Sequence, residues 1–185
     1  MRSVGKNPTM TRYFGSPKEE AMETRLKRAC LWVAFVGIFA AMLAGTMLAQ
    51  PTDPQVGTWK LNLAKSKYSP GPAPKSATTK IEAAGAGTKV IVDQAPADGS
   101  TRHWEFTANY DGKDVPVIGN NPDADMIART RVNANTVKSI SKKNGKVTTT
   151  QTSTVSGDGK TRTVTTTGTN AAGQTVNNVA VYEKQ

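Results

Sequence analysis

The chain has 185 residues and a formal net charge of +10, which leaves room for one ordinary domain. A single Cys and a single His exclude a disulfide-stabilised fold and argue against a metal centre or a Cys- or His-based catalytic site. Seven basic and three acidic residues give +4 to residues 1–49, and the remaining +6 is scattered over residues 50–185, which disfavours a nucleic-acid partner.

Residues 1–21 are polar and show no periodic pattern of apolar residues. Met22 stands immediately before a much better start for an export signal. We therefore expect residues 1–21 to be either a disordered tail or the product of a misplaced start site, with Met1 and Met22 both open as initiators.

Residues 22–49 have the layout of an export segment. Arg25, Lys27 and Arg28 precede an uncharged run, Ala29–Ala49, as in a secretory signal peptide. Cleavage is predicted after the last residue of the run, although Met47 is larger than the residue preferred at position −3. The run exceeds the usual h-region of about 7–15 residues and reaches the roughly 20 that span a membrane. A cleaved signal and a membrane anchor through residues 29–49 both stay open, and either exports residues 50–185 to the periplasm or the exterior.

Residues 50–185 alternate short β-prone runs with turn signals. Four turns carry Asp-Gly or Asn-Gly pairs, which adopt positive φ at little cost; they lie at Asp98-Gly99, Asp111-Gly112, Asn144-Gly145 and Asp158-Gly159. About ten strands are expected, starting near Gly57, Thr78, Lys89, Thr101, Val115, Met126, Val137, Val147, Thr161 and Val176. The predicted fold is an all-β, antiparallel up-and-down meander closing into a lipocalin-like barrel.

Two stretches depart from this rhythm. Leu63–Ala77 contains three prolines, so it is expected to be a loop over one end of the barrel rather than strand or helix. Val147–Thr169 holds eleven threonines, which predicts strands with at least one wet face.

The first and last strands carry a family resemblance. Val56–Leu61 reads Val-Gly-Thr-Trp-Lys-Leu, and Val181–Lys184, near the end of the chain, reads Val-Tyr-Glu-Lys. Both stretches resemble the calycin superfamily, the lipocalins and fatty-acid-binding proteins, and the chain as a whole resembles small exported lipocalin-like proteins of bacteria. The resemblance implies a ligand-binding barrel. It departs from the fatty-acid-binding branch at Ala180, where that branch carries a carboxylate-binding Arg, and in the Pro-rich loop, which replaces two lid helices.

Candidate ligand contacts come from the expected interior. Trp104, Phe106 and Tyr110 share one face of an alternating strand that should point inward. Tyr182 is the residue retained from the resemblance. Gly57 and Trp59 are expected to form a structural plug at one end of the barrel rather than part of the lining.

Arg129 and Arg131 lie on one strand face. If this face is internal, the two guanidinium groups become candidates for an anionic head group. The aliphatic character of the opposite face, Met126, Ala128 and Val132, favours the alternative in which both arginines are surface charges.

Enzyme signals fail on inspection. Gly159-Lys160-Thr161 lacks the earlier Gly of a phosphate-binding loop, because that position is Thr154. Asp123 and Asp125 lack the other ligands of a calcium loop. The sequence therefore predicts a non-enzymatic, monomeric, exported protein that binds a small apolar or amphipathic, lipid-like ligand without a cofactor or metal. The alternative is a structural or surface-interaction β-domain of the cell envelope with a solid core.

Overall fold

The structure, a computed structural model, describes residues 53–185. The predicted tail, residues 1–21, and the predicted signal or anchor, residues 22–49, lie outside the described residues, and these domain boundaries stay predictions. Among residues 53–185 no helix has the length and apolar character needed to cross a membrane.

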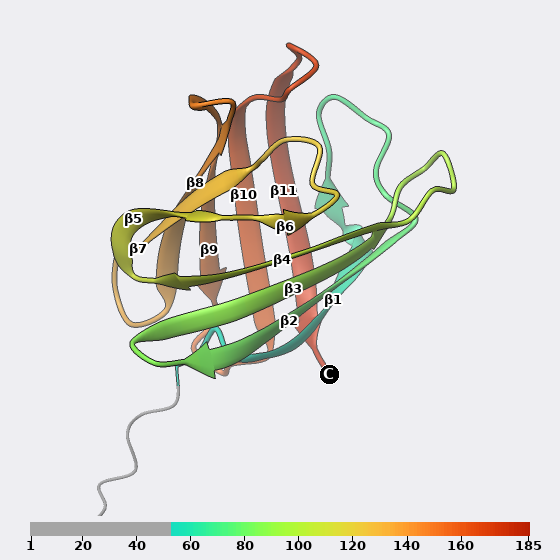
Figure 1. Ribbon diagram of the computed structural model, residues 1–185. Helices are drawn as coiled ribbons and strands as arrows, with labels where there is room; N and C mark the ends of the chain where they lie inside the picture. The colour runs from blue at the N-terminus through green and yellow to red at the C-terminus, as the bar shows by residue number, and fades with distance from the viewer. Residues whose placement is uncertain (1–52) are drawn as a thin grey trace, which may run out of the picture. The chain divides into compact units, whose positions relative to one another are not determined.

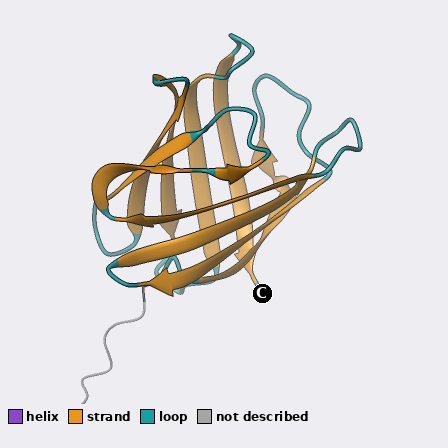
Figure 2. Cartoon of the chain, viewed as in Figure 1, coloured by secondary structure: helices purple, strands orange, loops and turns teal. Residues whose placement is uncertain are grey.

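The described residues form eleven antiparallel strands and no helix (Figures 1 and 2). The strands are β1 Gly57–Lys67, β2 Ser76–Ala84, β3 Gly87–Ala95, β4 Arg102–Asn109, β5 Asp111–Pro116, β6 Ile118–Gly119, β7 Met126–Arg131, β8 Thr136–Lys143, β9 Lys146–Val155, β10 Thr161–Thr169 and β11 Thr175–Lys184. The all-β antiparallel fold predicted from the sequence is confirmed, with β5 starting earlier than the expected Val115.

The sheet closes nearly completely into a barrel. Its strand order is β5-β7-β8-β9-β10-β11-β1-β2-β3-β4-β6. β5 pairs with β7 and β6 pairs with β4, while β5 and β6 follow each other along one segment (Figure 1). This segment therefore joins the two ends of the sheet.

The first and last strands pair with each other, which completes the meander. Leu61 lies opposite Tyr182 and Trp59 opposite Lys184. An up-and-down barrel in which the terminal strands pair is the architecture that the resemblance to the calycins implies, so this resemblance holds for the fold.

The hairpin turn between β8 and β9 forms at the Asn-Gly pair that the sequence indicated. Asn144 and Gly145, between β8 and β9, have φ of 50° and 74°, the pair of positive values that a two-residue hairpin requires. Asp111-Gly112 instead opens β5, where the register against β7 shifts.

The expectation that no strand continues past Leu63 is wrong. β1 runs to Lys67 and β2 begins at Ser76, so the connecting loop covers only residues 68–75. A register irregularity in the pairing with β11 falls between Asn62 and Lys67, and such an irregularity lets a strand bend without ending. The prolines themselves lie in the shorter loop.

The larger part of the apolar core lies toward one end of the barrel. It is a buried cluster of Trp59, Ile81, Val90, Phe106, Ala108, Ile127 and Val155. A second buried cluster consists of Leu61, Ala77, Val164 and Ala180, and Tyr182 packs against both. On β4 the side chains of Phe106 and Ala108 are buried while Thr107 and Asn109 are exposed, so the predicted alternation of this strand is confirmed. The core leaves the space above it open.

Candidate ligand-binding site

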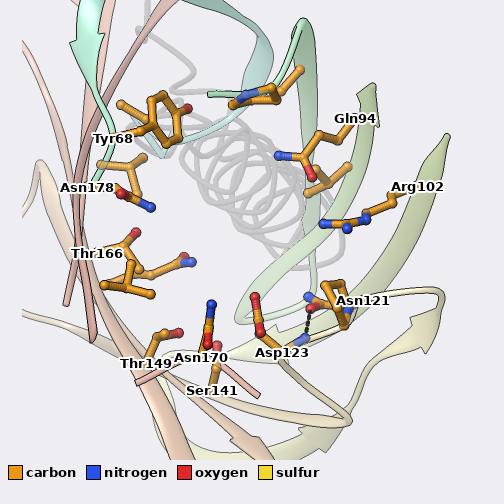
Figure 3. Close-up of a pocket in the computed structure, with 18 of the residues that line it drawn as sticks. Tyr68, Gln94, Arg102, Asn121, Asp123, Ser141, Thr149, Thr166, Asn170 and Asn178 are labelled. Carbon is orange, nitrogen blue, oxygen red and sulfur yellow. Dashed lines mark hydrogen bonds between the residues drawn. The ribbon is translucent and has the colours of Figure 1, made fainter. Parts of the chain in front are cut away.

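A cavity of about 500 Å³ occupies the barrel interior. It extends from the strands to the loops at one end, which supply Pro70, Ala97, Asn121 and Asn170 to its lining. Figure 3 shows Gln94 and Arg102 on one side of this space, facing a row of polar residues on the other. We call this loop end the mouth and the opposite end, near the apolar core, the floor.

The two walls differ in chemistry. The wall from β3, β4 and β7 is mainly apolar and contributes Val90, Val92, Trp104, Phe106 and Ile127. The wall from β8 and β9 is polar, with Ser139, Ser141, Thr149 and Gln151. Because alternate residues of a strand share one face, the Thr- and Ser-rich strands direct hydroxyl groups inward as well as outward. The cavity is amphipathic across its width.

Two buried guanidinium groups border the cavity. Arg129, on β7, has 2% of its surface exposed, and Arg162, on β10, has 8%; both line the cavity. Burial lowers the pKa of Arg162 to about 10 and also lowers the pKa of Arg129. A pKa of about 10 leaves Arg162 cationic at neutral pH, and the guanidinium group of arginine is in general protonated in proteins.

Neither guanidinium has a carboxylate partner among residues 53–185. The ion pairs in this part of the chain involve other cations. Arg129 donates to the hydroxyl of Thr88, and its Nε is buried without an acceptor. Its guanidinium carbon lies 5.9 Å from the centroid of the Phe106 ring. This cation is thus held mainly by a hydroxyl and by aromatic faces.

Arg162 is held through one nitrogen. Its Nε donates to Ser153 Oγ at 2.7 Å and to Gln55 Oε1 at 3.3 Å. No described residue accepts a hydrogen bond from its terminal nitrogens. The Tyr182 ring centroid lies 5.6 Å from its guanidinium carbon, and burial raises the pKa of the Tyr182 hydroxyl. Arg162 therefore presents unused donors beside a neutral tyrosine.

Of the residues predicted as ligand contacts, Trp104, Phe106, Tyr182 and Arg129 line the cavity. The interpretation that placed Arg129 on the outer surface is wrong. The expectation that the more apolar face of a strand points inward fails on β7. The cavity wall is itself partly polar, so the inward face of this strand can carry a charged side chain.

Tyr110 and Arg131 are absent from the lining and belong to a cluster centred on Asp53. The Tyr110 hydroxyl donates to Asp53 Oδ2 at 2.5 Å, and Arg131 donates to the same oxygen. Burial opposes ionisation of Asp53, but the hydrogen bonds from Tyr110, the Gln55 amide and Arg131 outweigh it and lower the pKa of the carboxyl group. The carboxylate pairs directly with Arg131; it makes no ion pair with Arg129 or Arg162, although its charge partly offsets the lowering of the Arg129 pKa by burial.

Trp59 is fully buried and also lies outside the cavity lining. Its indole N–H donates to the carbonyl oxygen of Gln55 at 2.9 Å. Nearby, Gly57 lies so close to Lys184 that a Cβ at this position would approach its side chain to 2.5 Å. These two residues shape the floor.

Sequence reasoning missed Arg162, Gln55 and Asp53. Arg162 could have been found, because it is the one charge on the strand face that also carries Val164. Asp53 and Gln55 gave no signal, since they precede the first strand and belong to no periodic pattern.

The residues 53–185 contain no group of three or more His, Cys, Asp or Glu side chains that could hold a metal ion. Asp123 accepts a hydrogen bond from the Ala171 amide at 3.0 Å, and Asp125 accepts one from the Asn144 amide at 2.8 Å. His103 pairs with Asp93 at 2.7 Å on an exposed face. Asp125 and His103 secure a loop and the barrel exterior, whereas Asp123 fixes a loop at the mouth and also lines the cavity there (Figure 3).

No protein-family model matches the chain, and no curated protein matches it. Among solved structures, the chain is similar to the crystal structure of the zebrafish ileal bile acid-binding protein complexed with cholic acid. The two share 14% identity with a TM-score of 0.41, and the match covers 71% of this chain and 99% of the other.

Proposed function

We propose that this protein binds a small amphipathic anion inside its barrel, with the anionic head group at Arg129 and Arg162. The observation that carries the proposal is the pair of buried guanidinium groups that border the cavity without a carboxylate partner among the described residues. Burying a charge without a partner costs several kcal/mol. An anionic ligand recovers part of this cost when it binds.

The cavity fits this class of ligand in size and in chemistry. Its volume of about 500 Å³ lies within the roughly 300–1,000 Å³ of small-molecule sites. The apolar wall with Trp104 and Phe106 contacts the hydrocarbon part of the ligand, and the hydroxyl groups of Ser139 and Ser141 contact its polar substituents. A purely hydrocarbon ligand would leave these hydroxyl groups unpaired.

The alternative, a solid structural β-domain, is disfavoured by the same cavity. A barrel that served only as a scaffold gains nothing from an open interior, because packing to normal protein density stabilises a core. The proposal includes export by residues 22–49 and a purely binding role without a chemical step.

The binding test uses the purified full-length chain and the fluorescent fatty-acid probe 11-(dansylamino)undecanoic acid, compared with its methyl ester. We expect saturable binding of the acid, displacement by unlabelled dodecanoate, and weaker binding of the ester, which has no charge for the guanidinium groups. Arg162→Met should remove the preference for the acid. Lys138→Met removes one positive charge from an exposed position of β8 and should not change it. Absence of saturable uptake by the unmodified chain would sink the proposal.

A further inference from the structure

The segment that enters the barrel, Asp53–Val56, ends directly beneath the cavity floor. Gln55 is 0% exposed, although it precedes the first strand. Its main-chain carbonyl accepts the Trp59 indole N–H, and its amide donates to Asp53 Oδ1 at 3.0 Å. Asp53 in turn is fixed by Tyr110 and Arg131. The segment is therefore anchored on both sides of Gln55.

The Gln55 side chain is fully hydrogen-bonded. Its Nε2 donates to the carbonyl oxygens of Asn135, at 2.9 Å, and Ser153, at 3.3 Å. Its Oε1 accepts from Ser153 Oγ at 2.9 Å and from Arg162 Nε at 3.3 Å. The two N–H groups of this carboxamide each have an acceptor, and its oxygen accepts from two donors. No hydrocarbon side chain can make these four hydrogen bonds.

The hydrogen bond to Gln55 fixes one end of the Arg162 guanidinium group. An arginine has five N–H donors, and Gln55 and Ser153 engage only the one on Nε. Because Nε is fixed, the plane of the guanidinium is fixed as well, and no described residue accepts a hydrogen bond from its terminal nitrogens. Arg162 lines the cavity, so these remaining donors are available to a ligand there. An unheld arginine side chain would have to be ordered at the moment of binding, which lowers affinity.

We propose that Gln55 is a positioning residue of the binding site, which orients Arg162 toward the anionic head group of the ligand. This inference rests on the proposed function. It makes the segment between the predicted export signal and the barrel a part of the site rather than a passive linker. The affinity for anionic ligands then depends on the position of Asp53–Val56 against the barrel.

Two substitutions test the inference on the full-length chain, with the dansyl acid and its methyl ester as probes. Gln55→Leu removes all four side-chain hydrogen bonds at nearly equal size. It should weaken binding of the acid about tenfold, the size of one hydrogen bond to a charged group, and leave binding of the ester unchanged. Gln185→Leu, at an exposed position, is the matched control and should change neither.

Gln55→Glu keeps the shape and the acceptor for Arg162 Nε but adds a negative charge beside it. The preference for the acid should disappear, because the new carboxylate takes the place of the head group as counter-ion. Thermal unfolding of each variant shows whether it is folded. Gln55→Met, which also lacks the carboxamide but is flexible and close to glutamine in size, replaces Gln55→Leu in the test if the leucine variant does not fold.

The outcomes separate the two proposals. Loss of acid binding alone in Gln55→Leu supports the positioning role, and loss of the preference in Gln55→Glu supports the assignment of the head group to the guanidinium beside Gln55. Unchanged preference for the acid in a folded variant overturns it and leaves the proposed function standing, and equal loss of acid and ester overturns it by showing that Gln55 only stabilises the barrel. Binding of neither probe by the unmodified chain overturns both proposals.

Discussion

Arg129 should reduce the stability of the empty protein, and its replacement by methionine measures how much. The buried Nε of Arg129 has no acceptor, and an unpaired buried donor costs about 1–3 kcal/mol. Methionine fills a similar volume with a flexible apolar side chain. The loss of the hydrogen bond to Thr88 offsets about 1 kcal/mol of this gain. We therefore expect Arg129→Met to leave the free energy of unfolding unchanged or raise it by up to about 2 kcal/mol, in the direction seen for other replacements of buried charges.

The assay is urea denaturation of the ligand-free chain, followed by fluorescence, together with titration of the dansyl acid. If Arg129→Met is more stable but binds the acid more weakly, then Arg129 contributes to ligand binding and destabilises the ligand-free fold. A variant that is less stable by 1 kcal/mol or more would refute the reasoning, because Arg129 would then be a structural residue satisfied by Thr88 and the aromatic rings. Lys138→Met controls for the change in net charge.

Three other results are expected from the floor of the barrel and from one tight contact. Trp59→Phe should destabilise the protein by about 2 kcal/mol, because it loses both volume and the hydrogen bond to the Gln55 carbonyl; thermal unfolding measures this. Asp53 has a pKa below its ordinary value of 3.8, so it stabilises the fold at neutral pH, and this contribution should be lost as the pH falls from about 4 through the folded-state pKa. Asp53→Asn should flatten that part of the stability profile, and an unchanged profile would contradict the assignment. Gly87→Ala should destabilise by about 3 kcal/mol, since a Cβ would meet a carbonyl oxygen of β4 at 2.0 Å; Gly157→Ala, where nothing lies within 4 Å, should be near neutral.

The fold was predictable because its determinants are local. The alternation around Trp104 and Phe106 shows which face of β4 is inside, and the Asn144-Gly145 pair marks a hairpin regardless of the rest of the chain. With short turns between consecutive strands, antiparallel pairing follows, and the barrel follows from the need to pair both edges.

The site was predictable only where its residues are apolar. Phe106 was found by its periodicity, whereas Arg129 was assigned to the wrong face because the parity argument assumes an apolar interior. Arg162 shares its strand face with the buried Val164, a signal that the many threonines of this strand weaken because threonine is compatible with either face. Gln55 acts through hydrogen bonds to residues about 100 positions away, and no pattern within a single sequence reports contacts of that range.

The pairing of β1 with β11 has a consequence for how the barrel forms. Trp59 meets Lys184, almost the full length of the described chain away, so the first strand has no partner on that side until the final residues are available. Contacts of such long sequence separation slow folding, because the entropy of closing the loop must be lost before the pairing forms. The chain should therefore stay open until its last strand has been made, and removal of β11 should leave β1 and β10 as exposed edges prone to aggregation.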